Sequence, residues 1–250
     1  MTRRLSVRLV LGGIAAIVII AAGALALTRS DHPLDLRPRA PSQRPALMLI
    51  TTLPILFPEE FTLQSSGSKT LGALETRYKV LPIGTTDARS LSQARLLLMA
   101  HPLAQPAENL VALDQWVRGG GRLLLLADPR LDWPSKRPLG DLLRPPPSFA
   151  DTGLLAHWGL QLEAPKEAGP VLLGGGHNPV VYISPGRMIS TNRDCDLSRA
   201  DIIAECWMGK GKVAVVADAD FLNAEMAERN GSTVENQLRE LLELLGNLER

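Results

Sequence analysis

Three short apolar runs predict buried strands in the first half of the chain. Residues 46–51 (ALMLIT), 95–100 (RLLLMA) and 122–127 (RLLLLA) are almost continuously apolar. A strand with one face in water alternates apolar and polar residues, whereas the strands of a parallel sheet are buried on both faces and read as unbroken apolar runs. These three runs therefore indicate a parallel sheet.

Two helical patterns lie between the apolar runs. One spans residues 68–79, and the other begins at Pro106 and ends at the triple glycine 119–121. Strands that alternate with helices predict an α/β fold with a doubly wound, mostly parallel sheet. Each helix has apolar residues at helical spacing, which are Leu71, Leu74 and Tyr78 in the first and Leu110, Leu113 and Val117 in the second.

The second half of the chain predicts shorter elements, a β-rich addition to this sheet. Six prolines interrupt residues 129–147, which we name the proline-rich loop and expect to be a long ordered loop or a flap. A short helix is expected over residues 152–158, and short strands are expected within residues 170–190. The runs 202–207 and 212–217 predict two strands that a Gly-Lys-Gly turn joins.

The last predicted helix carries its own start signal. Ser232 and Glu235 have the spacing of a capping box, in which the serine hydroxyl and the glutamate satisfy backbone N–H groups of the first turn. The apolar stripe that follows predicts one buried helical face, formed by Val234, Leu238, Leu241, Leu242 and Leu245.

Residues 9–27 form an apolar and glycine-containing run without a charge, long enough to cross a bilayer. We expect a cytoplasmic tail over residues 1–8, a single transmembrane helix or signal anchor over 9–27 and a Pro-rich tether over 28–45. Residues 46–250 would then form a domain in the periplasm, held at the bacterial inner membrane. The alternative is a cleaved signal peptide, with Ala24-Leu25-Ala26 as the small-residue site.

Composition and charge exclude a general nucleic-acid binder. The 250 residues contain 27 Lys and Arg against 26 Asp and Glu, a net charge of +1, and 4% aromatic residues. A chain of this kind has neither the basic surface that neutralises phosphates nor the aromatic platforms that stack on bases.

Polar residues follow three of the predicted strands. His101, Asp128, Asp218 and Asp220 stand directly after apolar runs. Ligands of open parallel sheets bind outside the carboxyl ends of the strands, so these four are the candidate ligand-binding residues. The alternative is structural, because Asp at a strand end also caps helices and shapes turns. No metal-binding or nucleophile motif is present, and we expect no cofactor, no metal and no catalytic residue.

Cys195 and Cys206 are the only cysteines. In the periplasm an isolated pair is normally oxidised, so we expect a disulfide that pins the polar loop around Cys195 onto the strand that holds Cys206. The alternative is two small buried thiols.

Five stretches in this order resemble the extracytoplasmic domain of GldG-type proteins, accessory components linked to ABC transporters. The stretches are MLITTLP (48–54), ARLLLMAHP (94–102), LVALDQWVRGGGRLLLLADPRLDWPS (110–135), LLAHWGLQLE (154–163) and GKVAVVADADFLN (211–223). The resemblance implies a fold similar to class I glutamine amidotransferases, and a partner such as an ABC-transporter permease or another envelope protein.

The resemblance also bears on catalysis. In active amidotransferases a nucleophilic Cys follows the strand after the Gly-rich turn, and here Asp128 or Pro129 stands at that position. The base of those enzymes is a His after a late strand, and ADADFLN contains none. We therefore expect a pseudoenzyme, a non-catalytic accessory or binding domain. The alternative is a hydrolase that uses Asp128, Asp218 and Asp220, with or without a divalent metal.

Overall fold

The computed structural model describes residues 35–57, 59, 68–174 and 178–250. The chain divides into two units, Met1–Asp35 and Leu36–Arg250, and the fold described below is that of the second. The predicted tail, the predicted membrane segment over residues 9–27 and the tether up to residue 34 lie outside the described residues. Within the described part of the chain, no helix has the length and apolarity needed to span a bilayer.

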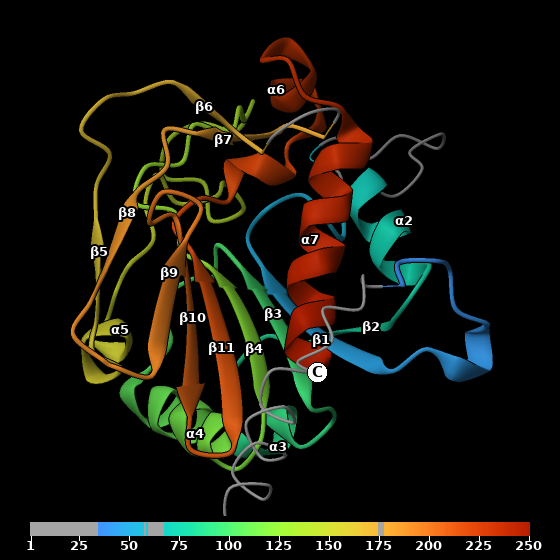
Figure 1. Cartoon of the computed structure of the whole chain (residues 1–250), viewed down its shortest axis with the longest axis vertical. Coiled ribbons are helices and arrows are strands. Elements are labelled where there is room, and N and C mark those ends of the chain that lie inside the picture. The colour runs from blue at the N-terminus through green and yellow to red at the C-terminus, as the bar shows by residue number, and fades with distance from the viewer. Residues whose placement is uncertain (1–34, 58, 60–67, 175–177) are drawn as a thin grey trace, which may run out of the picture. The chain divides into compact units, whose positions relative to one another are not determined.

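A seven-stranded sheet forms the centre of this unit, in the order β2-β1-β3-β4-β11-β10-β9 (Figure 1). The first five strands of that order are parallel, and β10 and β9 are antiparallel additions at one edge. The predicted mostly parallel α/β sheet is thereby confirmed. The strands are β1 (Ala46–Thr51), β2 (Lys79–Pro82), β3 (Leu96–Ala100), β4 (Arg122–Leu126), β9 (Cys195–Ser198), β10 (Ile203–Met208) and β11 (Gly211–Val216).

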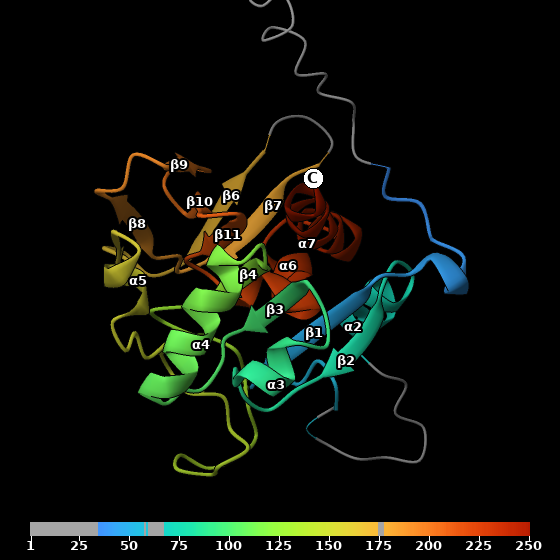
Figure 2. The ribbon, with the colours of Figure 1, turned by 90° about the horizontal axis from the view of Figure 1, so that it is seen from below.

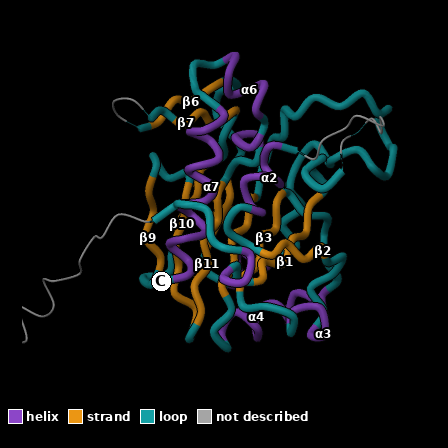
Figure 3. Tube along the Cα trace, turned by 90° about the vertical axis from the view of Figure 1, so that its right-hand side faces the viewer, coloured by secondary structure: helices purple, strands orange, loops and turns teal. Residues whose placement is uncertain are grey.

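Helices cover both faces of the sheet, as Figure 2 shows. The helices α2 and α7 lie on one face, where α7 packs against β4 and β11, and α3 and α4 lie on the other. In Figure 3, α7 runs along the strands. The helices are α2 (Lys69–Glu75), α3 (Ala88–Leu91), α4 (Ala107–Arg118), α5 (Leu154–His157), α6 (Ala224–Arg229) and α7 (Val234–Glu249), with short 3₁₀ turns at η1 (Pro41–Gln43) and η2 (Asp220–Leu222).

Burial on both faces explains the apolar runs. All five residues of β3 are buried, as are the central four of β1 and the last four of β4. Two small antiparallel sheets complete the unit and match the expected β-rich addition. They pair β5 (Leu160–Glu163) with β8 (Arg187–Ser190), and β6 (Pro170–Leu173) with β7 (Val180–Ile183).

Three local predictions are wrong. Thr233, one residue after the predicted cap, accepts from the N–H of Asn236 and caps α7, while the Ser232 hydroxyl donates to the Pro179 carbonyl instead. Cys195 lies in strand β9 and not in a loop. The first helix ends at Glu75, because the chain must turn before Lys79 pairs with Ala46 as the start of β2.

Candidate functional site

The strand order places a topological switch point at β1. From β1 the chain moves to β2 on one side of it, and then crosses to β3 on the other side. The helix that follows β1, α2, and the helix that precedes β3, α3, consequently lie on opposite faces of the sheet. The loops that leave the carboxyl ends of β1 and β3 therefore diverge. Such a crevice is where open α/β sheets bind ligands.

A pocket of about 640 Å³ lies at this point. One wall begins with Thr51, the last residue of β1, and continues through Thr52 into the segment that follows this strand. Leu103, which follows β3, also lines the pocket. The opposite wall belongs to the proline-rich loop, through Arg137, Leu142, Leu143, Arg144 and Pro145. Its size is within the range of sites for small molecules, which are mostly apolar with a few polar groups.

The rim of the pocket exposes large apolar side chains. Leu142 is 94% exposed, Leu143 67%, Phe57 68% and Leu103 56%. Large side chains of this kind gathered around one cavity mark a surface that binds something apolar.

Among the described residues that line the pocket, the charged groups are two guanidiniums and one carboxylate. Arg137 donates from Nη2 to the Glu59 carbonyl at 3.3 Å, and its Nη1 lies 3.6 Å from an Asp141 carboxylate oxygen. Arg144 donates from Nη1 to the Arg137 carbonyl. The Glu59 carboxylate accepts from the backbone N–H of Lys136 at 3.0 Å.

His101 connects β3 to the loop that forms the far wall. Its side chain is fully buried, and its φ of 48° lies in the left-handed region. Nε2 donates to the Pro146 carbonyl at 2.9 Å, and the His101 carbonyl accepts from the Thr52 hydroxyl at 2.5 Å. Burial lowers the pKa of His101, so the ring is neutral at pH 7.

The three aspartates lie together beneath the other end of the loop. Asp128 accepts from the backbone N–H groups of Arg130 and Ala219, both at 2.8 Å. Asp218 accepts from those of Ile183 at 2.6 Å and Phe221 at 2.7 Å. These bonds tie the loop, β7 and η2 to the ends of β4 and β11.

Asp220 completes the cluster. One oxygen, Oδ2, accepts from the Asp132 N–H at 2.6 Å, and the buried Oδ1 has no partner among the described residues. The Asp132 carboxylate in turn accepts from the Ser184 hydroxyl at 2.6 Å. Through Asp220 the loop is bound to η2, and through Asp132 to the end of β7.

Burial raises the pKa of all three carboxyl groups of this cluster. Desolvation raises the pKa of Asp128 to about 6 and that of Asp220 to about 8, and the charge of Asp128 raises the latter further. Burial, with the charges of Asp128 and Asp220, raises the pKa of Asp218 well above its ordinary value. The described part of the chain has no group of three or more His, Cys, Asp or Glu side chains that could hold a metal ion.

The four candidates from the sequence thus sit behind the pocket and not in its walls. All four side chains are fully buried, and each bonds the proline-rich loop or a neighbouring segment to the sheet. Sequence reasoning missed the lining residues Thr51, Arg137 and Arg144. Their common position depends on the strand order, which no single stretch of sequence encodes.

No protein-family model and no curated protein matches this sequence. Among solved structures, the chain is similar to the exo-beta-1,4-mannosidase Op5Man5 from Opitutaceae bacterium strain TAV5 (12% identity, TM-score 0.47), covering 80% of this chain and only 36% of the mannosidase. It is also similar to the mmIFT52 N-terminal domain (13%, TM-score 0.49, covering 81% and 96%). A third likeness is to the cytoplasmic protein STM3548 from Salmonella typhimurium (12%, TM-score 0.42, covering 80% and 98%). At TM-scores below 0.5, none of these carries an argument about the chemistry of this chain.

Proposed function

We propose that this chain is a non-catalytic binding domain, held at the periplasmic face of the bacterial inner membrane by residues 9–27. It serves an ABC-type transport or envelope system and takes its ligand or partner in the pocket between β1 and the proline-rich loop. The observation that carries the proposal is the coincidence of that pocket, with its exposed apolar rim, and the switch point of the sheet.

Two further observations support export and a lack of catalysis. The chain joins Cys195 to Cys206 in a disulfide, a bond typical of oxidising compartments. Asp128 stands where the related amidotransferases carry a nucleophile, yet both of its oxygens accept backbone N–H groups and no part of it reaches solvent. We infer a glutamine amidotransferase-like fold that serves binding.

The alternative, a hydrolase built on Asp128, Asp218 and Asp220, is less well supported. A raised pKa in a cluster of carboxyl groups is a feature of acid catalysts. These three groups, however, lie below the surface, and both oxygens of Asp128 and of Asp218 and one oxygen of Asp220 accept backbone N–H groups of neighbouring segments. A divalent cation needs several free oxygen ligands, and this arrangement does not fit one.

The test uses the full chain in bacteria. A photo-crosslinking amino acid replaces Leu143 at the pocket rim, or Val111 on α4 as an equally apolar control that is 56% exposed. We expect crosslinks to an envelope component from position 143 and none from position 111. In parallel, alkaline phosphatase fused after Arg250 should be active and green fluorescent protein dark. Equal crosslinking from both positions would refute pocket binding, and a fluorescent fusion would refute export.

A further inference from the structure

We infer that the pocket binds an alkyl chain that carries an anionic head group, a carboxylate or a phosphate. This rests on the proposed function of the pocket as a binding site and adds the class of ligand. The lining combines two features that such a molecule matches, an apolar surface and guanidinium donors that the described residues do not saturate.

The cationic part is the pair Arg137 and Arg144. Among the described lining residues, two guanidiniums and the Glu59 carboxylate face the same cavity. Glu59 is already bonded to the Lys136 N–H, and Arg137 also lies 3.6 Å from the Asp141 carboxylate. A guanidinium offers five N–H donors. Within the described part of the chain, Arg144 uses one of them, on the carbonyl of Arg137. The remaining donors suit the paired oxygens of a carboxylate or phosphate.

The apolar part is the surface formed by Phe57, Leu103, Leu142 and Leu143. These side chains are 56–94% exposed and lie around the same cavity as the two arginines. A flexible alkyl chain that lies along them removes apolar surface from water while its head group stays at the arginines. Each buried methylene contributes about 0.8 kcal/mol in transfer free energy, so affinity should rise steeply with chain length.

The pocket and the segment that leads into β1 lie at opposite ends of that strand. Leu36–Arg250 begins with the segment that leads into the amino end of β1, whereas the pocket is at the carboxyl end of that strand. The apolar rim is therefore presented at the edge of the sheet opposite to the one where the chain enters the unit.

The experiment measures binding of radiolabelled octanoate by equilibrium dialysis, with the full chain in lipid nanodiscs and empty nanodiscs as the blank. We expect saturable binding of one octanoate per chain. Acetate should not compete, and octyl glucoside below its micelle concentration should compete weakly. Decanoate should bind roughly tenfold more tightly than octanoate. Competition by octyl phosphate, compared with octanoate, separates a phosphate-bearing lipid from a fatty acid as the source of the head group.

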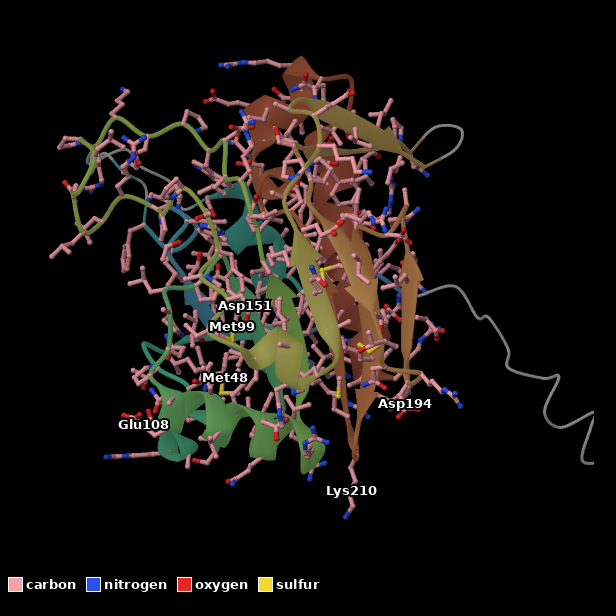
Figure 4. All side chains as sticks on the ribbon, turned by 90° about the vertical axis from the view of Figure 1, so that its left-hand side faces the viewer. Met48, Met99, Glu108, Asp151, Asp194 and Lys210 are labelled. Atoms are coloured by element: carbon pink, nitrogen blue, oxygen red, sulfur yellow. A yellow bond between two sulfur atoms is a disulfide. The ribbon has the colours of Figure 1, made fainter. Side chains whose placement is uncertain are left out.

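Two variants locate the ligand. Arg144→Gln should weaken octanoate binding roughly tenfold or more, the usual effect of removing a charge-assisted hydrogen bond. Lys210→Gln is the matched control, because Lys210 lies at the tip of the β10–β11 hairpin, at the far end of the sheet from the proline-rich loop (Figure 4). Leu143→Ser tests the apolar rim and should weaken octanoate binding; because Leu143 is 67% exposed, the substitution leaves the buried core unchanged.

Unchanged octanoate binding by Arg144→Gln, or no saturable binding of any alkyl anion, would overturn this inference. The two proposals fail differently. If no alkyl anion binds but position 143 still crosslinks selectively to an envelope protein, the ligand class is wrong and the binding function stands. If neither result is obtained, both are wrong.

Discussion

The backbone N–H of Asp132 donates a 2.6 Å hydrogen bond to the carboxyl group of Asp220, although 88 positions separate the two residues. Asp220 belongs to η2, directly beyond the end of β11, and Asp132 belongs to the proline-rich loop. The bond therefore fixes one end of the loop to the sheet, while His101 fixes the other end through Pro146. The position of the pocket wall therefore depends on two buried side chains, His101 and Asp220, whose protonation can be measured.

Asp220→Asn should flatten the pH dependence of stability. Burial raises the pKa of Asp220 to about 8 from its ordinary 3.8, so between these values the folded protein keeps a proton that the unfolded chain has released. The free energy of unfolding should fall as pH rises through this window and level off above pH 8. Asparagine cannot ionise, and its carbonyl can still accept from Asp132. Urea unfolding of the full chain at pH 5, 6, 7 and 8 measures the difference.

The stability of Asp220→Asn relative to the wild type should increase with pH, by at most about 1.4 kcal/mol per pH unit. His101 titrates in both proteins, so its contribution cancels in the comparison. Loss of the Asp220 charge removes one of the causes that raise the pKa of Asp218, which flattens the curve of the variant in the same direction. The control is Asp194→Asn, which makes the same substitution at an exposed carboxyl group outside the buried cluster (Figure 4). A wild-type curve that rises from pH 5 to 8 in parallel with that of Asp220→Asn would contradict the prediction.

Asp128→Asn should lower stability without removing binding. The carboxylate accepts one N–H on each oxygen, and an amide has one oxygen and places its NH₂ against the second N–H donor. A buried donor left unsatisfied costs about 1–3 kcal/mol. Denaturant unfolding measures the loss, and crosslinking from position 143 should persist in the folded variant. If a fully folded Asp128→Asn protein lost its function in the cell, the hydrolase alternative would gain support.

His101→Ala should release the proline-rich loop. The ring donates to the Pro146 carbonyl, and the backbone at this position has a φ of 48°, a region that His and Asn adopt more readily than Ala. We expect trypsin to cleave after Arg130 and Lys136, the two basic residues of the loop that no proline follows, faster than in the wild type. His101→Asn, which keeps a donor and tolerates the backbone angle, should be cleaved more slowly than His101→Ala. Equal cleavage of all three proteins would show that the ring does not hold the loop.

The central strands were predictable because both of their faces are buried. Every residue of β3 is buried, and so is every residue of β4 except Arg122, so selection for apolar residues acts on almost the whole of each strand, and the runs 95–100 and 122–127 record it. The edge strands leave no such record. In β2, Lys79 and Pro82 are exposed, and β9 has the sequence CDLS with its last three residues exposed.

The site was predictable only in part, for a different reason. His101, Asp128 and Asp218 were found because each directly follows an apolar run, and Asp220 because it stands two positions after Asp218. They proved to be buried connections between the loop and the sheet, a role that polar residues at strand ends can equally serve. Arg137 and Thr51 meet across the pocket because β1 lies inside the sheet, next to β3. That juxtaposition depends on which strands are neighbours, and local sequence does not specify it.

The disulfide between Cys195 and Cys206 should contribute to stability and report the compartment. The two residues are directly paired on β9 and β10, and the bond closes a loop with a sequence separation of 11. For a loop of this size the chain-entropy model gives about 3 kcal/mol of stabilisation. Wild-type protein in dithiothreitol should lose roughly this amount, and the Cys195→Ala/Cys206→Ala variant should be insensitive to the reductant. Mass spectrometry after non-reducing alkylation should find neither thiol modified in protein from the periplasmic face of the membrane. Two alkylated cysteines would contradict both the bond and the export of the domain.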